Sequence, residues 1–209
     1  MRPPIHLTAM TPTSIHLQLP DWVPVLLAQK PAVFGDIEER MALVIELAQR
    51  NVTEMTGGPF GAAIFESHSG RLLAAGVNLV VPQHCSVAHA EMVAIMLAQR
   101  AAQTFDLSAP GLPACELVTS TEPCAMCMGA IPWSGVQRVV CGARDEDARA
   151  AGFDEGHKPP DWISAYHARG ITVIRDILRT QAAQVLLDYQ QKGGHLYNPQ
   201  RGSGGEGTE

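Results

Sequence analysis

The 209-residue sequence has no long apolar run, no excess of basic residues and no paired set of cysteines. Its longest apolar piece near the N-terminus, WVPVLLA, is far shorter than the roughly 20 residues of a transmembrane helix. Prolines interrupt the rest of the N-terminal stretch, which excludes the continuous apolar core of a signal peptide. We therefore expect a cytoplasmic protein with no membrane partner.

Basic residues are too few for a protein that binds a phosphate backbone. The sequence has 15 Lys and Arg against 21 Asp and Glu, which gives a formal net charge of −6. A nucleic-acid-binding surface uses many Lys and Arg contacts, so we expect no nucleic-acid partner. The five cysteines are an odd number without a small secreted framework around them, which favours reduced thiols in the cytoplasm.

What the sequence does contain is enough apolar material for one α/β domain, with 46% hydrophobic residues. Asp36 and Glu39 form a capping pattern ahead of a helix whose apolar positions share one face. Residues 1–35 have the pattern of an irregular arm, and the Gly-rich residues 198–209 that of a disordered tail. The domain is therefore predicted to span residues 36–197.

Strand and helix patterns follow one another along this domain. After the first helix, two short apolar segments joined by SHSGR predict a β-hairpin, and a helix follows over residues 89–103. Helical segments then alternate with three further strands, and a last helix is expected over about residues 178–191; the strands are CELVTST, VQRVVCGA and ITVIRD. This order predicts a mixed sheet with helices on both faces.

Two short motifs, EPCAMC and HAE, carry the expected chemistry. Cys124 and Cys127 begin a helix, where both sulfurs point to one position and the helix N-terminus favours thiolates. With His89 they form a Cys2His set that leaves the fourth position of a zinc ion open to water. Zinc provides hydroxide at neutral pH, and Glu91 can carry the proton to a ring nitrogen and a leaving amine. H-x-E with P-C-x-x-C is the established signature of zinc deaminases.

Simpler interpretations of the same residues stay open. The Cys-x-x-Cys pair could be a redox pair, and a glutamate in the first helical turn often serves only the helix dipole. Cys85 could supply a fourth ligand and make the zinc structural. Otherwise Cys85, Cys115 and Cys141 have the character of small core residues.

With these motifs the chain resembles the cytidine deaminase-like superfamily, and within it the bacterial guanine deaminases. The resemblance covers about residues 36–197 and also rests on GGPFGAAIF, GVNLVV, TSTEPCAMCMGAIPWSGV and AAGFDEG. It implies a three-layer α/β/α fold with a central mixed five-stranded sheet, and one Zn2+ per subunit. It further implies a homodimer, in some members with the C-terminal segment exchanged between subunits.

The resemblance also implies roles for single residues. His89, Cys124 and Cys127 would bind the zinc, and Glu91 would shuttle protons. The second carboxylate, Glu155, would accept from the N–H groups of guanine and help to move a proton to the leaving amine.

Five more residues are implied to bind the purine base. Asn78 would hydrogen-bond the base, Asp154 would lie beside the second carboxylate, and Phe60 and Trp133 would lie near the ring. Tyr197 would belong to a C-terminal lid, with Gly193 and Gly194 as its hinge; the alternative is a frayed end with one anchoring tyrosine.

We therefore expect hydrolytic deamination of guanine at C2, giving xanthine and ammonia. A carboxylate complements the N–H donors of guanine, and an asparagine amide serves a donor and an acceptor together. The alternatives are a tRNA adenosine deaminase, which the acidic balance disfavours, and a deaminase of cytosine or of a triazine such as ammeline. A zinc-stabilised binding module without catalysis and a solvated surface role for Glu155 also stay open.

Overall fold

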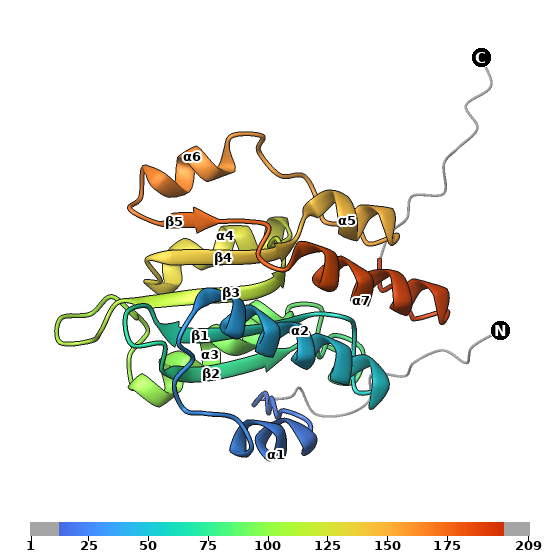
Figure 1. The fold of residues 1–209 in the computed structure, drawn as a ribbon, viewed down its shortest axis with the longest axis horizontal. Helices are drawn as coiled ribbons and strands as arrows, with labels where there is room; N and C mark the ends of the chain where they lie inside the picture. Colours follow the sequence, from blue (N-terminus) through green and yellow to red (C-terminus); the bar gives the residue numbers. More distant parts are fainter. Residues whose placement is uncertain (1–12, 199–209) are drawn as a thin grey trace.

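A central mixed sheet of five strands organises residues 13–198, the part of the chain that this computed structural model describes (Figure 1). The hairpin strand β1 is antiparallel to β2 and to β3, whereas β3, β4 and β5 are parallel. The strand order is β2-β1-β3-β4-β5, with β1 (Gly61–Glu66), β2 (Leu72–Val77), β3 (Cys115–Thr121), β4 (Arg138–Ala143) and β5 (Thr172–Ile174). The predicted mixed five-stranded sheet is confirmed.

Helices cover both faces of this sheet (Figure 1). One face carries α2 (Ile37–Thr53) and α7 (Arg179–Gln191), and the other carries α3 (Ala90–Ala102) and α4 (Ala125–Ser134). Three short helices complete the described chain: α1 (Trp22–Ala28), α5 (Asp145–Ala150) and α6 (Trp162–His167). The three-layer α/β/α arrangement is the one that the sequence predicts.

The two-residue period of the strands divides the apolar core into two clusters, one under each helical layer. In β1, Ala63 and Phe65 belong to the cluster with α2 and α7, and Ala62 and Ile64 belong to the cluster with α3 and α4. All seven residues of β3 are buried, as expected for a strand covered on both faces. The sheet therefore provides a rigid support for the loops at its ends.

The predicted starts of α2 and α3 agree with the structure. The carboxylate of Asp36 accepts a hydrogen bond of 2.7 Å from the backbone N–H of Glu39, which caps α2. His89 is the N-cap residue of α3, with an extended backbone. The helix therefore begins at the motif that the sequence analysis identifies as the metal site.

The prediction of an irregular N-terminal arm was wrong for residues 22–28, which form α1. Pro24 suggests a break, but it lies in the first turn, where backbone N–H groups have no partner within the helix. Val23 and Leu26 are buried in the cluster with α2, and the indole of Trp22 donates to the hydroxyl of Thr56 at 3.0 Å. Part of the arm is thus packed against the domain.

The ends of the chain add little to this description. Residues 1–12 and 199–209, which include all but the first residue of the predicted tail, lie outside the described part. The boundaries at 36 and 197 therefore stay predictions. Within residues 13–198, no helix has the length and apolar character of a transmembrane span.

Candidate active site

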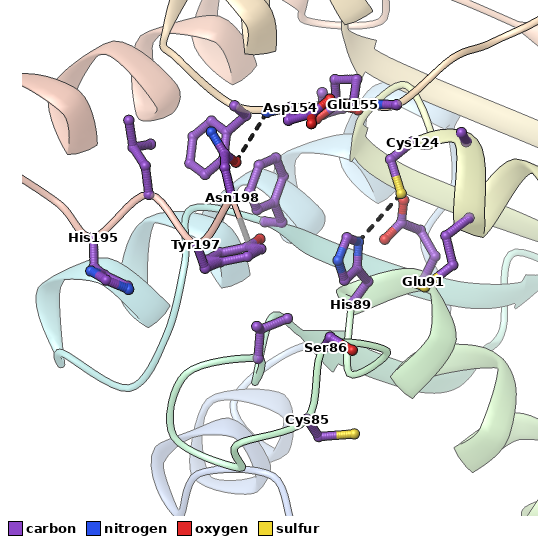
Figure 2. A pocket seen from close by; sticks show the side chains of 18 of the residues that line it. Cys85, Ser86, His89, Glu91, Cys124, Asp154, Glu155, His195, Tyr197 and Asn198 are labelled. Atoms are coloured by element: carbon purple, nitrogen blue, oxygen red, sulfur yellow. Dashed lines mark hydrogen bonds between the residues drawn. The ribbon is translucent and has the colours of Figure 1, made fainter. Parts of the chain in front are cut away.

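A pocket of about 730 Å³ opens where β3 leads into α4 (Figure 2). Five segments far apart in the sequence form its wall. They are Phe60 before β1, the loop that ends at His89, the start of α4, residues 153–156 after α5, and residues 195–198 near the C-terminus. Most of the predicted site residues line this pocket, whereas Asn78, Cys127 and Trp133 do not.

The three predicted metal ligands converge at the base of this pocket. His89 and Cys124 are the N-cap residues of α3 and α4, and Cys127 lies one helical turn after Cys124. One ligand atom from each residue lies within 4.8 Å of the other two. The Cys124 Sγ atom is 3.5 Å from His89 Nδ1, close to the roughly 3.6 Å that tetrahedral zinc imposes between a sulfur and a nitrogen ligand. The residues present fit a zinc ion.

The protonation of the cysteines agrees with a metal site. A hydrogen bond from the Cys127 thiol lowers the pKa of Cys124 to about 4, and the neighbouring His89 ring adds to this effect. The same hydrogen bond, together with burial, raises the pKa of Cys127. Cys124 is thus a thiolate at neutral pH, which is the form that binds metal ions.

The structure separates the other cysteines from this cluster. Cys85 lies in the loop before α3 and is not part of the three-residue ligand cluster of the described chain. Cys115 and Cys141 are buried in the core on the α3 side of the sheet, as the sequence analysis expects. A three-ligand site leaves one tetrahedral position of the metal to face the pocket, which favours a catalytic zinc over a structural one.

Glu91 lies in the first turn of α3, two residues after the histidine ligand. It lines the pocket although only 6% of its surface is exposed, and burial raises the pKa of its carboxyl group. It hydrogen-bonds to the thiol of Cys127 and is not itself part of the ligand cluster. This buried carboxyl group can hold a proton beside the metal, which a residue that only complemented a helix dipole would not need to do.

Asn78 follows β2 and is buried behind the pocket wall. Its side-chain Nδ2 donates to the hydroxyl of Tyr197 at 2.7 Å, and its backbone carbonyl accepts from the side chain of Asn51 at 2.9 Å. A Cβ atom at Gly58 would lie 3.2 Å from the Oδ1 atom of Asn78, so this position favours glycine. In this structure Asn78 therefore reaches the pocket through the tyrosine hydroxyl.

Glu155 is in the pocket wall and not on a solvated surface, since it is 5% exposed. Its backbone carbonyl accepts from the N–H of Ala125 at the start of α4, at 2.9 Å. Burial raises the pKa of its carboxyl group to about 8, although the nearby Lys158 opposes this shift. Asp154 also lines the pocket, but its carboxylate is exposed and accepts from the N–H of Gly156 in the same loop.

Of the two aromatic residues predicted near the base, only one lines the pocket. Phe60 lines the pocket and meets Phe153 edge to face, with ring centroids 4.8 Å apart. Trp133 does not line the pocket and is 79% exposed. It lies nine residues along α4 from Cys124, a distance of about 13 Å at 1.5 Å per residue. The structure does not bring Trp133 to the pocket, and that part of the predicted site needs correction.

The C-terminal segment covers one side of the pocket (Figure 2). The ring of Tyr197 lies 6.1 Å from that of His89, edge to face. The side chain of Asn198, absent from the predicted site, donates to the carbonyl of Gly152 at 3.0 Å and accepts from the N–H of Asp154 at 3.2 Å. These contacts contradict a frayed end. Sequence patterns give no signal for Asn198, because its partners precede it by more than 40 residues.

The comparisons with known proteins agree with this site. Residues 35–143 match the model of the cytidine and deoxycytidylate deaminase zinc-binding region. The chain is 41% identical to guanine deaminase of Bacillus subtilis (strain 168) over 111 residues, which are 53% of this chain and 67% of that protein.

Solved structures extend the similarity to most of the chain. Guanine deaminase from Nitrosomonas europaea is 49% identical, with a TM-score of 0.82 over 88% of this chain and 100% of that chain. A structure in complex with 2,6-diaminopurine is 51% identical, with a TM-score of 0.83 over 88% of this chain and 97% of its own. The match of sequence, fold and metal ligands leads to one conclusion: this chain belongs to the cytidine and deoxycytidylate deaminase zinc-binding family.

Proposed function

We propose that this protein is a zinc-dependent guanine deaminase, which converts guanine and water into xanthine and ammonia. The observation that carries the proposal is the three-ligand metal cluster with two buried carboxyl groups, Glu91 and Glu155, in the same pocket. The guanine deaminases of Bacillus subtilis and Nitrosomonas europaea and the complex with 2,6-diaminopurine support a purine base as the substrate.

His89, Cys124 and Cys127 hold the metal in this proposal. A zinc ion bound there supplies hydroxide at neutral pH, because it lowers the pKa of water to about 7. Glu91 takes one proton from the attacking water and delivers it to guanine N3; it then takes the proton of the new hydroxyl at C2 and delivers it to the departing amine. Its buried position and raised pKa suit both the protonated and the ionised state in one cycle.

The base is recognised by polar groups on the other side of the pocket. Glu155 accepts from the N–H groups of guanine, and Asn78 offers an amide that can donate to the carbonyl at C6 and accept from an N–H. The amide of Asn78 already donates to the hydroxyl of Tyr197. A bound base therefore either replaces this hydroxyl as the acceptor or hydrogen-bonds to the same pair of side chains. Phe60 and Phe153 provide an apolar surface for the ring.

The C-terminal segment favours a free base over a nucleotide in a folded RNA. Residues 195–198 line the pocket, and Tyr197 lies against the ring of His89, close to the metal ligands. Gly193 has a φ of +69°, a conformation that favours glycine, and can serve as the hinge of a lid. We propose that this lid closes over guanine, with triazines such as ammeline as side substrates.

A homodimer is part of the proposal. Large apolar side chains are exposed near one end of α3 and α4, among them Phe105 at 84% and Trp133 at 79%. The backbone hydrogen bond between Leu107 and Ser134 brings the loop after α3 to the end of α4. We propose that a second subunit covers Trp133, and we assign the protein to the cytoplasm, where thiol ligands stay reduced.

Ammonia release by the zinc-loaded protein tests the proposed function. The substrates to compare are guanine, guanosine, adenine, cytosine, cytidine, ammeline and a short tRNA anticodon stem. We expect the highest kcat/KM with guanine. Preference for another base would support zinc-dependent deamination but refute guanine as the substrate. Absence of ammonia from every substrate would favour a zinc-stabilised binding module without catalysis.

A further inference from the structure

We propose that Lys158 is a positioning residue that holds the carboxylate of Glu155 in place relative to the loop of the metal ligands. This inference rests on the proposed function, in which Glu155 binds guanine. Lys158 lies in the loop between α5 and α6, and sequence patterns do not single it out.

Lys158 is unusually buried for a lysine, with 8% of its side chain exposed. Lysine is almost never found in such a position without partners. Its ammonium group donates to the carbonyl oxygen of Pro123 at 3.0 Å, pairs with the carboxylate of Asp145, and lies 3.8 Å from the Oε2 atom of Glu155. Pro123 and Asp145 accept hydrogen bonds from the ammonium group, whereas Glu155, at 3.8 Å, is its ion-pair partner.

The three partners of Lys158 belong to three segments that meet at the pocket. Pro123 directly precedes the ligand Cys124, Asp145 is the first residue of α5, and Glu155 is in the wall loop. The ammonium group therefore connects the metal-ligand loop to the side chain proposed to bind the base. A change in its position would alter the distance between the metal and that carboxylate.

The backbone of the wall loop has supports that do not involve Lys158. The carbonyl of Glu155 accepts from the N–H of Ala125, and the carbonyl of Gly156 accepts from the guanidinium of Arg149 at 2.6 Å. Arg149 is itself held by Asp145 at 2.6 Å. With the backbone fixed in this way, the specific contribution of Lys158 is the position of the Glu155 carboxylate.

The charges around Glu155 make this contribution necessary. Asp145 places negative charge near its carboxylate, whereas Lys158 places a positive charge there. Within the described residues, Lys158 is the one basic side chain that forms an ion pair with Glu155. Burial raises the pKa of this carboxyl group and Lys158 opposes that shift, so the ion pair favours the ionised form that accepts from an N–H of the base.

A double-mutant cycle separates this role from a general structural one. We expect Lys158→Met, which keeps an apolar stem of similar length, to lower kcat/KM for guanine by on the order of tenfold, in line with couplings between neighbouring residues. Part of this loss should appear in KM. In the Glu155→Gln background the same substitution should cost less than about twofold, because the carboxylate it positions is already absent. Exposed Lys192→Met is the matched control, with wild-type kinetics expected.

Losses that multiply in Lys158→Met/Glu155→Gln would overturn the proposal, as would wild-type kcat/KM in Lys158→Met. Zinc content is measured for every variant. If Lys158→Met loses zinc or its fold, Lys158→Gln takes its place, because it keeps donors for Pro123 and Asp145 while removing the charge. Here, too, a loss that vanishes beside Glu155→Gln supports the proposal, and no loss or an additive loss contradicts it. Failure of the proposed function would show separately, as absent guanine turnover in the wild type.

Discussion

The metal centre and the wall proposed to bind the base are built in different ways. His89 and Cys124 cap two helices that pack against the central sheet, so neighbouring backbone fixes their positions. Asn78, Glu155 and Tyr197 come from a strand end, a loop and the C-terminal segment, and they depend on contacts across the chain. Under the proposed function, the chemical step is built into the fold, whereas the choice of base depends on loops that can vary independently.

Loss of a metal ligand should have the largest effect on turnover. We expect Cys124→Ser to lose bound zinc and to release no measurable ammonia from any base, because the thiolate at the α4 N-terminus is a ligand. Cys85→Ser is the matched control, since Cys85 lies outside the ligand cluster, and it should retain zinc and turnover. Zinc is measured by atomic absorption. A Cys124→Ser protein with full zinc content would contradict the assigned ligand set.

Loss of the second carboxylate should affect the base and not the metal. We expect Glu155→Ala to reduce kcat/KM for guanine by about 10²-fold, as for a positioned acid–base or binding group, with zinc content unchanged. Asp161→Ala is the control, because that residue is exposed and does not line the pocket. Normal guanine kinetics in Glu155→Ala would show that Glu155 does not bind the base.

Loss of the hydrogen bonds that hold the C-terminal segment against the wall loop should have a smaller effect on turnover. Asn198→Ala removes two hydrogen bonds to the wall loop, and we expect KM for guanine to rise about 3- to 10-fold with little change in kcat. The thermal midpoint should change little, because the substitution leaves the apolar contacts of Leu196 and Tyr197 with the core in place. An unchanged KM would show that the segment does not control access to the pocket.

The last prediction concerns stability and not turnover, and it is a dependence of stability on pH. The carboxyl of Glu155 has a pKa of about 8 in the folded protein and of about 4.5 when unfolded, so the folded state binds more protons in this window. Its contribution to stability is therefore fully present below pH 4.5 and is lost as the pH rises towards 8. In Glu155→Gln the loss of thermal midpoint between pH 5 and pH 8 should be smaller than in the wild type; an identical loss would contradict the shift.

Much of the fold and the ligands of the metal centre could be predicted from the sequence, the fold from local patterns and the ligand set from the H-x-E and P-C-x-x-C signature. The alternation of strand and helix segments gives the five-stranded sheet, and the spacing of Cys124 and Cys127 at a helix start brings both sulfurs to one place. The helix α1 was missed, since Pro24 has the pattern of a break although it occupies a first turn.

The rest of the pocket depends on contacts that no local pattern encodes. Trp133 lies in a motif of the resemblance, yet the rise of α4 carries it away from the metal. Lys158 connects the loop of Glu155 to Pro123, 35 residues earlier, and Asn198 contacts partners more than 40 residues earlier. A sequence predicts such contacts only when the arrangement of the strands and loops is already known.

The kinetics of Glu91→Gln test most directly whether the metal half of the pocket performs the chemistry. Glutamine keeps the size of the buried side chain but cannot carry a proton. We predict that zinc content and the KM for guanine stay near those of the wild type, while kcat for ammonia release falls by about 10²- to 10⁴-fold. A zinc-loaded Glu91→Gln protein with near-normal turnover would contradict the account.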